Sequence, residues 1–391
     1  MVKAETVIVG AGVVGASIAY HLTERGAKDV LVIDRARGPG YGSTGRATGG
    51  VRAQFETAIN IDLSLYSLGF FDECDFDCRY EPRGYLFFAT DDAQLDYLKR
   101  NVEFQKSRGV REVALVDPQT IAEICPILEC SDITGGSFGA RDGFIDPLAV
   151  MRGFSSGARA RGAEIRYETI GLFIETANGR VTGIETNKGR IECENIVLAT
   201  GAWAHELART VGIDLPVTPQ RRQIVWAKSK KTLPENLPMV IDIGSGFHFR
   251  PARDFFDPAA NADNTEVLFA YPDPAERPSF NVDFDEAFIE KVYEKARHRS
   301  PFLYETEVVR EKCRAGLYEN TPDHHAILGG CALGGLYFAN GFSGHGVMHS
   351  PATGRALAEI ILDGRASFLD VSCLSFDRFA KGELLHETAF I

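Results

Sequence analysis

The segment that most constrains the fold is TVIVGAGVVGASIAYHLTERGAKDVLVIDR, residues 6–35. A β-branched run ends at Gly10, a helix-period pattern follows, and a second apolar run ends at Asp34. Gly10, Gly12 and Gly15 form a GxGxxG pattern, which alone is weak evidence because it also occurs by chance. Its place between a strand and a helix, with an acid after the next strand, predicts a dinucleotide-binding βαβ unit rather than an unliganded turn.

Each residue of this unit has a predicted role. Gly10 permits the tight turn, Gly12 lets a pyrophosphate approach the helix N-terminus, and Gly15 lets helix and strand pack closely. Asp34 accepts a ribose hydroxyl. NAD and FAD share the adenosine diphosphate half that such a turn binds, so the fingerprint leaves both open.

Two further segments are suited to a bound dinucleotide. GYGSTGRATGGVR, residues 40–52, is a polar, glycine-rich loop that would follow the pyrophosphate, with Ser43, Thr44 and Arg46 as phosphate contacts. NIVLATGAW, residues 195–203, is an apolar strand that ends in small residues, against which a ligand could lie. A plain strand-to-turn junction explains the second segment equally well.

The segment GFSGHGVMHSPATG, residues 341–354, combines a bare loop with a helix start. Ser350 and Pro351 predict the N-cap and first position of a helix that runs to about Asp363 and stops at Gly364. The loop before it would turn backbone donors toward a ligand that gains negative charge, as a flavin does on reduction.

Composition limits the classes of partner. The chain has 391 residues, 45% hydrophobic and 25% charged, which predicts two or three domains. Its net charge of −12 argues against a nucleic-acid surface and favours a small-molecule partner. No export signal or membrane-spanning run is recognised, and the eight cysteines form no CxxC pair, which predicts reduced thiols in a cytoplasmic protein. His324 and His325 do not face one metal, and no metal is predicted.

These motifs, with RRQ at 221–223 and TPDHHAILG at 321–329, resemble in order the FAD-dependent D-amino-acid oxidase superfamily. Within it the chain is most similar to the branch of sarcosine oxidase, dimethylglycine dehydrogenase and the proline dehydrogenase β-subunit. The resemblance implies FAD as cofactor and oxidation of a secondary or primary amine. The predicted cofactor-binding residues are Gly10, Gly12, Val13, Val14, Gly15, Asp34, Arg35, Ser43, Thr44, Arg46, Ala47, Thr48, Gly49, Ile170, Ala199, Thr200, Gly201, Trp203, Gly316, Gly341, Phe342, Ser343, Gly344, His345, Gly346 and Met348.

The resemblance also implies an α/β chain that crosses between two domains. A Rossmann-like FAD-binding domain would comprise 1–83, 142–213 and 316–391, and a mostly antiparallel substrate sheet with flanking helices would comprise 84–141 and 214–315. Strands are predicted at 83–90, 221–228, 246–251 and 266–272, and helices at 103–109 and 285–299. Residues 255–265 are interpreted as an exposed loop, with a lid as the less favoured alternative.

The predicted catalytic residues are Arg52, His248, His345 and Met348. By resemblance Arg52 pairs with a substrate carboxylate, although a solvated or phosphate-paired arginine is the alternative. His248 and His345 would face the flavin or substrate, or be core histidines. Sarcosine oxidases carry a lysine where this chain has Met348, which favours a cyclic or N-substituted amino acid over sarcosine itself.

Two further expectations come from the resemblance. Relatives that tether FAD use a histidine or cysteine where this chain has Gly45, Gly49 and Gly316, so FAD is predicted to bind non-covalently, with Cys313 the nearest thiol. Phe269 is aligned with the lysine that assists oxygen in oxidases, which favours an unidentified acceptor and a dehydrogenase. The alternatives are a nicotinamide-dependent dehydrogenase and a non-catalytic flavin subunit of a larger complex; a homo-oligomer is also open.

Overall fold

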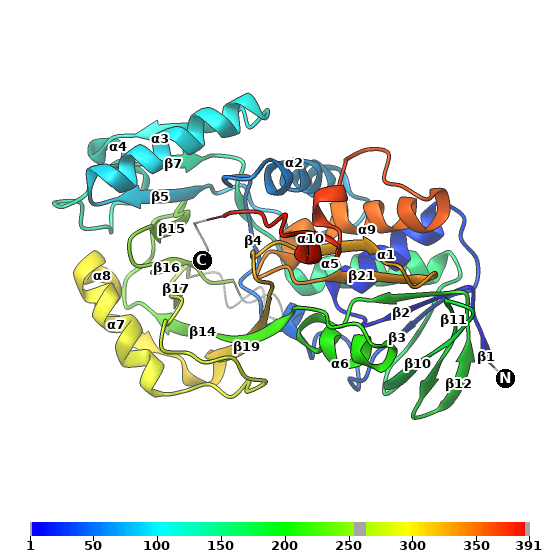
Figure 1. Cartoon of the computed structure of the whole chain (residues 1–391). Coiled ribbons are helices and arrows are strands. Elements are labelled where there is room, and N and C mark those ends of the chain that lie inside the picture. Colours follow the sequence, from blue (N-terminus) through cyan, green and yellow to red (C-terminus); the bar gives the residue numbers. More distant parts are fainter. Residues whose placement is uncertain (1, 254–262, 388–391) are drawn as a thin grey trace.

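A computed structural model describes residues 2–253 and 263–387 of the chain. Its strands form two large sheets that lie in opposite halves of the molecule, with helices on their outer faces (Figure 1). The chain passes between the halves several times, so each sheet is built from segments that are far apart in the sequence. The domain boundaries predicted above stay a prediction.

The first sheet has the strand order β20-β21-β13-β2-β3-β9 and is parallel except for the β20–β21 pair. Alternate residues of its central strands are buried on opposite faces, as in sheets covered on both sides. This explains the continuous apolar runs in the sequence. The strands are β2 (Thr6–Val9), β3 (Val30–Ile33), β9 (Glu164–Arg166), β13 (Asn195–Leu198), β20 (Ile327–Gly330) and β21 (Leu336–Asn340).

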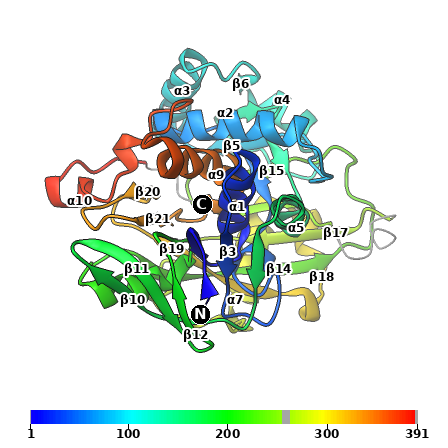
Figure 2. The ribbon, with the colours of Figure 1, turned by 90° about the vertical axis from the view of Figure 1, so that its right-hand side faces the viewer.

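Helices cover one face of this sheet, and a smaller sheet covers the other. Helix α1 packs between α5 and α9, and α2 lies against α9 (Figure 2). The small sheet has the order β1-β12-β11-β10, and its apolar side chains share a core with β2, β3 and α6. The elements are α1 (Val13–Glu24), α2 (Ala58–Glu73), α5 (Pro147–Ala160), α6 (Ala204–Ala208), α9 (Gly346–Asp363), β1 (Val2–Lys3), β10 (Gly171–Ala177), β11 (Arg180–Thr186) and β12 (Gly189–Glu192).

The second sheet has the order β18-β14-β17-β16-β15-β5-β7-β6, with β19 paired to β14, and is antiparallel except for β5–β15. Phenylalanines from its strands meet α4, α7 and α8 in one core. The elements are β5 (Tyr85–Ala89), β6 (Val113–Val116), β7 (Gly135–Gly139), β14 (Thr218–Lys228), β15 (Met239–Asp242), β16 (His248–Pro251), β17 (Glu266–Ala270), β18 (Glu307–Val308), β19 (Arg314–Asn320), α3 (Asp92–Ser107), α4 (Pro118–Ile124), α7 (Ala287–Arg299) and α8 (Pro301–Tyr304).

The α/β fold class and the predicted strands and helices of the second half are confirmed, with changed bounds. The helix expected at 103–109 is the end of α3, and α7 begins two residues later than expected. The loop prediction at 255–265 falls mainly outside the described residues.

The predicted start of the last long helix is wrong. Helix α9 begins at Gly346, with His345 as its N-cap, so Pro351 lies inside it, while the end at Asp363 and left-handed Gly364 is confirmed. Pro351 has no N–H to donate to the carbonyl of Val347. The hydroxyl of Ser350 donates to that carbonyl at 2.9 Å, so the serine that suggested a cap satisfies the acceptor that the proline leaves free.

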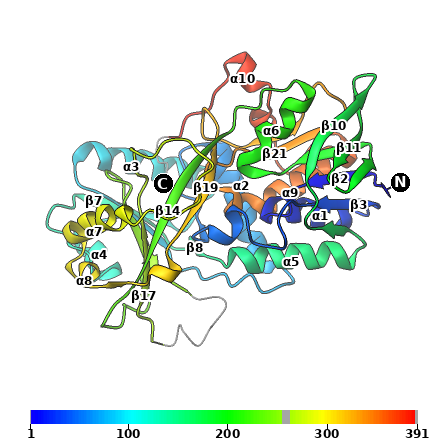
Figure 3. The same ribbon diagram turned by 90° about the horizontal axis from the view of Figure 1, so that it is seen from below.

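Two long strands connect the halves. Figure 3 shows β14 and β19 running side by side from the second sheet toward the first. The end of β19 leads into the turn 321–326 and then β20, so side chains of one ladder can reach both halves. The candidate site lies along this ladder.

Candidate active site

An elongated cavity of about 620 Å³ runs between the two halves. At one end it is lined by Gly10 and Asp34, where β2 and β3 finish, and at the other by His248 and Tyr271 of the second sheet. The carboxyl ends of parallel strands are the usual ligand-binding edge of such a sheet. The cavity therefore extends from the edge of the first sheet, where such folds bind nucleotides, to a second region lined by the second sheet.

The glycine-rich turn leaves no room for side chains. Gly10 has φ +111°, and a Cβ there would lie 2.2 Å from the carbonyl oxygen of Ala199. A Cβ on Gly15 would lie 1.9 Å from the carbonyl oxygen of Gly10, so Gly15 serves helix–strand packing and does not line the cavity. The carboxylate of Asp34 accepts from the N–H groups of Ala11 and Ala36, both at 2.7 Å. This fixes its orientation beside the cavity.

The polar loop at 40–52 contacts the cavity mainly through its backbone. Ser43 donates to the carbonyl of Leu317 at 2.7 Å and Arg46 to that of Ala315 at 2.6 Å, so both predicted phosphate contacts bind β19 instead. Thr44 accepts from the N–H of Val13 at 3.1 Å, at the start of α1. Hydrogen bonds of this loop thus connect the start of α1 with β19.

The other predicted cofactor residues fall along the cavity wall with few exceptions. Arg35 stacks on Trp203, with 4.0 Å from the guanidinium carbon to the ring centroid. Gly341 and Ser343 do not line the cavity. The hydroxyl of Ser343 donates to the carbonyl of Gly341 at 3.3 Å within the loop 341–346. The predicted residues that line it are Gly10, Gly12, Val13, Val14, Asp34, Arg35, Ser43, Thr44, Arg46, Ala47, Thr48, Gly49, Ile170, Ala199, Thr200, Gly201, Trp203, Gly316, Phe342, Gly344, His345, Gly346 and Met348.

Four polar atoms of the cavity wall have no hydrogen-bond partner within the described residues. They are Thr200 Oγ1, Arg222 Nε, Glu319 Oε2 and His345 Nε2. Burial raises the pKa of Glu319 to about 7, although the N–H groups of Phe342 and Gly341 lower it. Buried polar atoms are normally paired, so these orphans indicate a polar ligand that completes them. An FAD, with hydroxyls and ring heteroatoms, fits this wall.

At the far end of the cavity, Arg52 is only 4% exposed. It donates to the carbonyl of Gln54 and stacks on Phe55, and among the residues that the structure describes no carboxylate forms an ion pair with it. The carboxylate of Asp142 acts on Arg52 only at longer range, because Asp142 accepts from the N–H of Ala53 and the amide of Gln54. A buried guanidinium without a carboxylate in ion-pair contact is costly. The arrangement is suited to an anionic ligand in the cavity.

His248 lies on the same wall. Its Nδ1 is 2.9 Å from the carbonyl of Gly246, which can only accept, so Nδ1 carries the proton and Nε2 keeps a lone pair. Burial lowers the pKa of His248 to about 4, and the cations Arg222 and Arg52 lower it further. His248 is therefore neutral at physiological pH. Burial also holds the pKa of His345 well below its usual range.

The sequence analysis missed three further polar residues of this pocket, Arg222, Tyr318 and Tyr85. Arg222 lies in the RRQ motif, to which no role was assigned. Tyr318 lies two residues after Gly316, and alternation along β19 could have placed it on the same face. Tyr85 is fully buried, and its position depends on strand pairing that the sequence does not reveal.

Phe269 does not face the pocket, so its predicted alignment is wrong. His248 pairs with Ala270 across β16 and β17, which puts Ala270 on the cavity side and Phe269 in the core against Phe247 and Tyr293. Cys313 also points away, with its sulfur 3.4 Å from the N–H of Trp226. The described residues that line the cavity include no cysteine and no lysine.

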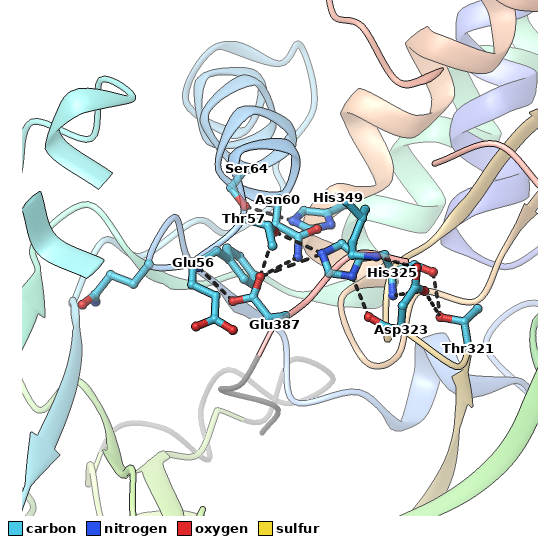
Figure 4. Close-up of polar contacts among 12 residues, drawn as sticks. Glu56, Thr57, Asn60, Ser64, Thr321, Asp323, His325, His349 and Glu387 are labelled. Atoms are coloured by element: carbon cyan, nitrogen blue, oxygen red, sulfur yellow. Dashed lines mark hydrogen bonds and ion pairs between the residues drawn. The ribbon is translucent and has the colours of Figure 1, made fainter. Parts of the chain in front are cut away.

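A polar network lies behind the pocket (Figure 4). The carboxylate of Glu387 accepts from the N–H of Glu56 at 2.9 Å, the hydroxyl of Thr57 at 2.8 Å and the amide of Asn60 at 3.1 Å. Thr57 also lies 3.1 Å from Nε2 of His325. The chain near its C-terminal end thus fixes the start of α2, immediately after the segment that carries Arg52.

The family of the chain follows from its similarity to known proteins. A family model described as FAD dependent oxidoreductase (DAO) matches residues 5–360. The chain belongs to the FAD dependent oxidoreductase (DAO) family. The resemblance inferred from the motifs is confirmed, FAD is the cofactor, and the nicotinamide alternative is set aside.

The relatives of this DAO-family chain include enzymes that oxidise amino acids. It is 30% identical to the FAD-dependent oxidoreductase domain-containing protein 1 of Bos taurus, over 98% of this chain and 86% of the relative. It is 27% identical to the mitochondrial dimethylglycine dehydrogenase of Homo sapiens, over 97% of this chain and 45% of that protein. The crystal structure of L-proline dehydrogenase from P. horikoshii superposes with a TM-score of 0.88 at 30% identity and covers 98% of this chain and 100% of that one.

Two further expectations concern membrane-spanning helices and metal sites in residues 2–253 and 263–387. No helix there is long and apolar enough to cross a membrane, and no group of acidic, histidine and cysteine side chains could hold a metal ion. Because the human relative is described as mitochondrial, the cytoplasmic location stays a prediction.

Proposed function

We propose that this DAO-family protein oxidises the C–N bond of a small secondary or primary amino acid. The observation that carries the proposal is the buried guanidinium of Arg52, which lines the cofactor cavity and forms no ion pair with a carboxylate of residues 2–253 or 263–387. A substrate carboxylate would supply the missing charge and accept two N–H bonds in a fixed geometry. Arg52 would thereby orient the substrate Cα toward the cofactor.

FAD supplies the two-electron acceptor for the hydride that leaves Cα. The amine must be neutral when this happens, because its lone pair forms the new C=N bond, and water then hydrolyses the imine. His248 is neutral and offers a lone pair on Nε2, so it would accept a hydrogen bond from the amine without competing for positive charge. The residues' work is orientation and exclusion of water rather than proton transfer.

The pocket favours an N-substituted or cyclic amino acid over sarcosine. Met348 lies on the cavity wall at the first turn of α9, where the sarcosine oxidases have a lysine. A thioether packs against methylene groups and supplies no charge. The carboxylate would therefore depend on Arg52 more strongly than in those relatives.

An acceptor other than oxygen is also proposed. Oxidases place a lysine over the flavin ring to stabilise developing superoxide, and no lysine lines the described part of this cavity. Ala270, which stands where Phe269 was expected, supplies no charge either. Comparing reoxidation of the reduced enzyme by air-saturated buffer and by a quinone dye tests this, and equal rates with one hydrogen peroxide per turnover would overturn it.

The experiment for the main proposal is an anaerobic screen. The purified holoprotein is mixed with a panel of primary, N-methylated and cyclic amino acids, and loss of the flavin's visible absorption is followed. At least one amino acid is expected to bleach it. If dithionite bleaches the flavin but every amine fails, the alternative of a non-catalytic subunit in a larger complex is favoured.

A further inference from the structure

We propose that Arg222 binds a second acidic group of the substrate, so that the preferred substrates carry a further carboxylate on the side chain or on the nitrogen. This inference rests on the proposed amino-acid oxidation and deepens it. It assigns a specificity-determining role to a residue of the RRQ motif, to which the sequence analysis attached no function.

Strand pairing places Arg222 in the substrate pocket. On the β14–β19 ladder Arg222 pairs with Gly316, so the two lie on one face together with Tyr318. The guanidinium carbon of Arg222 lies 5.5 Å from the ring centroid of Tyr318, and all three residues line the cavity. A Cβ on Gly316 would lie 3.1 Å from the side chain of Arg46, so at Gly316 the ladder packs against Arg46, while Arg222 and Tyr318 line the cavity with their side chains.

Arg222 forms no ion pair among the described residues, although Glu276 and Asp273 act on it at longer range. The nearby acids already have partners, since Glu276 pairs with Arg221 at 2.9 Å and Asp273 pairs with Lys291 at 2.7 Å. Arg222 donates to the backbone carbonyl of Arg221, but its Nε has no partner. Burial lowers the pKa of Arg222, which shows that the charge is poorly solvated where it stands. A ligand anion would relieve this cost.

Arg222 and Arg52 approach the same two side chains. Burial is the main influence on Tyr318 and His248, and both arginines in addition lower the pKa of each. Arg222, Arg52, Tyr318 and His248 all line the same cavity, so two cations contribute positive charge to it. A monocarboxylic amino acid neutralises only one of them, whereas a dicarboxylic one neutralises both, as electrostatic complementarity requires.

The first test compares matched substrates on the holoenzyme. Glutamate and glutamine, aspartate and asparagine in both enantiomers, and iminodiacetate and sarcosine form pairs that differ chiefly in one charge. We expect kcat/KM for the charged member of the preferred pair to exceed that of its partner by about 10-fold or more. The variant Arg222→Gln should reduce this ratio to near one by weakening the charged substrate only.

The second test needs no turnover. Glutarate and butanoate carry no amine that could be oxidised, and their Kd values are measured from the change in flavin absorption. We expect glutarate to bind the wild type about 10-fold or more tightly than butanoate, and Arg222→Gln to remove the difference. The control is Arg297→Gln, which changes an exposed arginine of α7 that stacks on Tyr304 and does not line the cavity, and it should keep both the preference and the flavin content.

Three results would overturn the inference. If the wild type shows equal kcat/KM values for the charged and the neutral member of each pair, the preferred substrate has no second anionic group. An unchanged preference in Arg222→Gln would assign it to another residue. Loss of FAD in Arg222→Gln, with normal preference after reconstitution, would make Arg222 a cofactor residue. Failure of every amine to reduce the flavin would contradict the proposed function, while the glutarate comparison would still decide the role of Arg222.

Discussion

The guanidinium of Arg52 lies flat against the ring of Phe55, with 4.0 Å between the guanidinium carbon and the ring centroid. The same ring meets the imidazole of His345 edge-on, at 4.9 Å between centroids. Phe55 therefore joins the proposed carboxylate site to the loop that lines the cofactor cavity. The N–H of Glu56, the residue after Phe55, donates to the carboxylate of Glu387, so the segment is fixed on both sides of Phe55.

This stacking predicts a specific effect of Phe55→Leu. Losing a cation–π contact worth about 0.5 to 2 kcal/mol should raise KM for an amino acid by about 2- to 30-fold, while kcat changes less. The matched comparison is Phe87→Leu, because the Phe87 ring also faces Arg52 but at the longer distance of 5.4 Å from the guanidinium carbon, so its loss should raise KM less. An equal or larger rise in KM for Phe87→Leu would show that general packing, not the Arg52 stack, is responsible.

Arg52→Ala should lower kcat/KM for amino acids by roughly 2 to 4 kcal/mol, or about 30- to 900-fold, because it removes one partner of a buried charge pair. The flavin content should hardly change. A simple amine without a carboxylate should lose little, which gives an internal control in the same kinetic assay. A variant that loses its flavin yet oxidises amino acids normally once reconstituted would identify Arg52 as a cofactor residue.

FAD should be released intact when the protein is denatured with acid. Gly316 stands at the position where tethering relatives have a cysteine, and the sulfur of Cys313 is directed toward Trp226, away from the cavity. The measurement is the colour of the supernatant after acid precipitation. A yellow pellet with a colourless supernatant would mean a covalent bond.

The cavity acid Glu319 should make stability depend on pH. Burial raises its folded-state pKa from 4.5 to about 7, so the native protein holds this proton more tightly than the unfolded chain does. Its favourable contribution is present below about pH 4.5 and is lost as pH rises through 7. Glu319→Gln should thus be more stable than the wild type at pH 8, by roughly 1 to 3 kcal/mol because the side chain partly faces the open cavity, and similar at pH 5.

Thermal unfolding of the two proteins at several pH values, after removal of FAD, measures this difference. The FAD-bound forms provide the comparison, since a ligand group that pairs with Glu319 would reduce the pH dependence. A stability difference that does not grow between pH 5 and pH 8 would show that Glu319 ionises normally.

Local constraints made the cofactor half predictable. Gly10 is required by its φ of +111° and Gly15 by its contact with Gly10, both within one βαβ unit, so their spacing in the sequence already indicates the turn. The start of α9 was mispredicted because Ser350 and Pro351 are local capping signals, whereas the observed start is determined by distant packing. Gly344, at φ +99°, lies where a Cβ would be 2.4 Å from the ring of Tyr318.

Which side chains face the substrate pocket depends on strand pairing, and the sequence alone does not reveal that pairing. Which of Phe269 and Ala270 faces the pocket is decided by the register of β17 against β16, and a shift of one residue exchanges the two faces. Arg222 was missed for the same reason, because its partner Gly316 lies far along the chain. Arg52 was found because the resemblance supplied its role, which neighbouring residues alone do not indicate.

The most direct test of the account is the stoichiometry of a single anaerobic turnover. Holoenzyme is mixed with an excess of the best amino acid without any electron acceptor, and the reduced flavin and the carbonyl product are both measured after quenching. Oxidation of the C–N bond predicts one imine, or one carbonyl product after its hydrolysis, for each flavin reduced, and an acyclic substrate also releases one amine or ammonia. A flavin that is fully reduced without formation of an imine or a carbonyl product would contradict the proposed reaction.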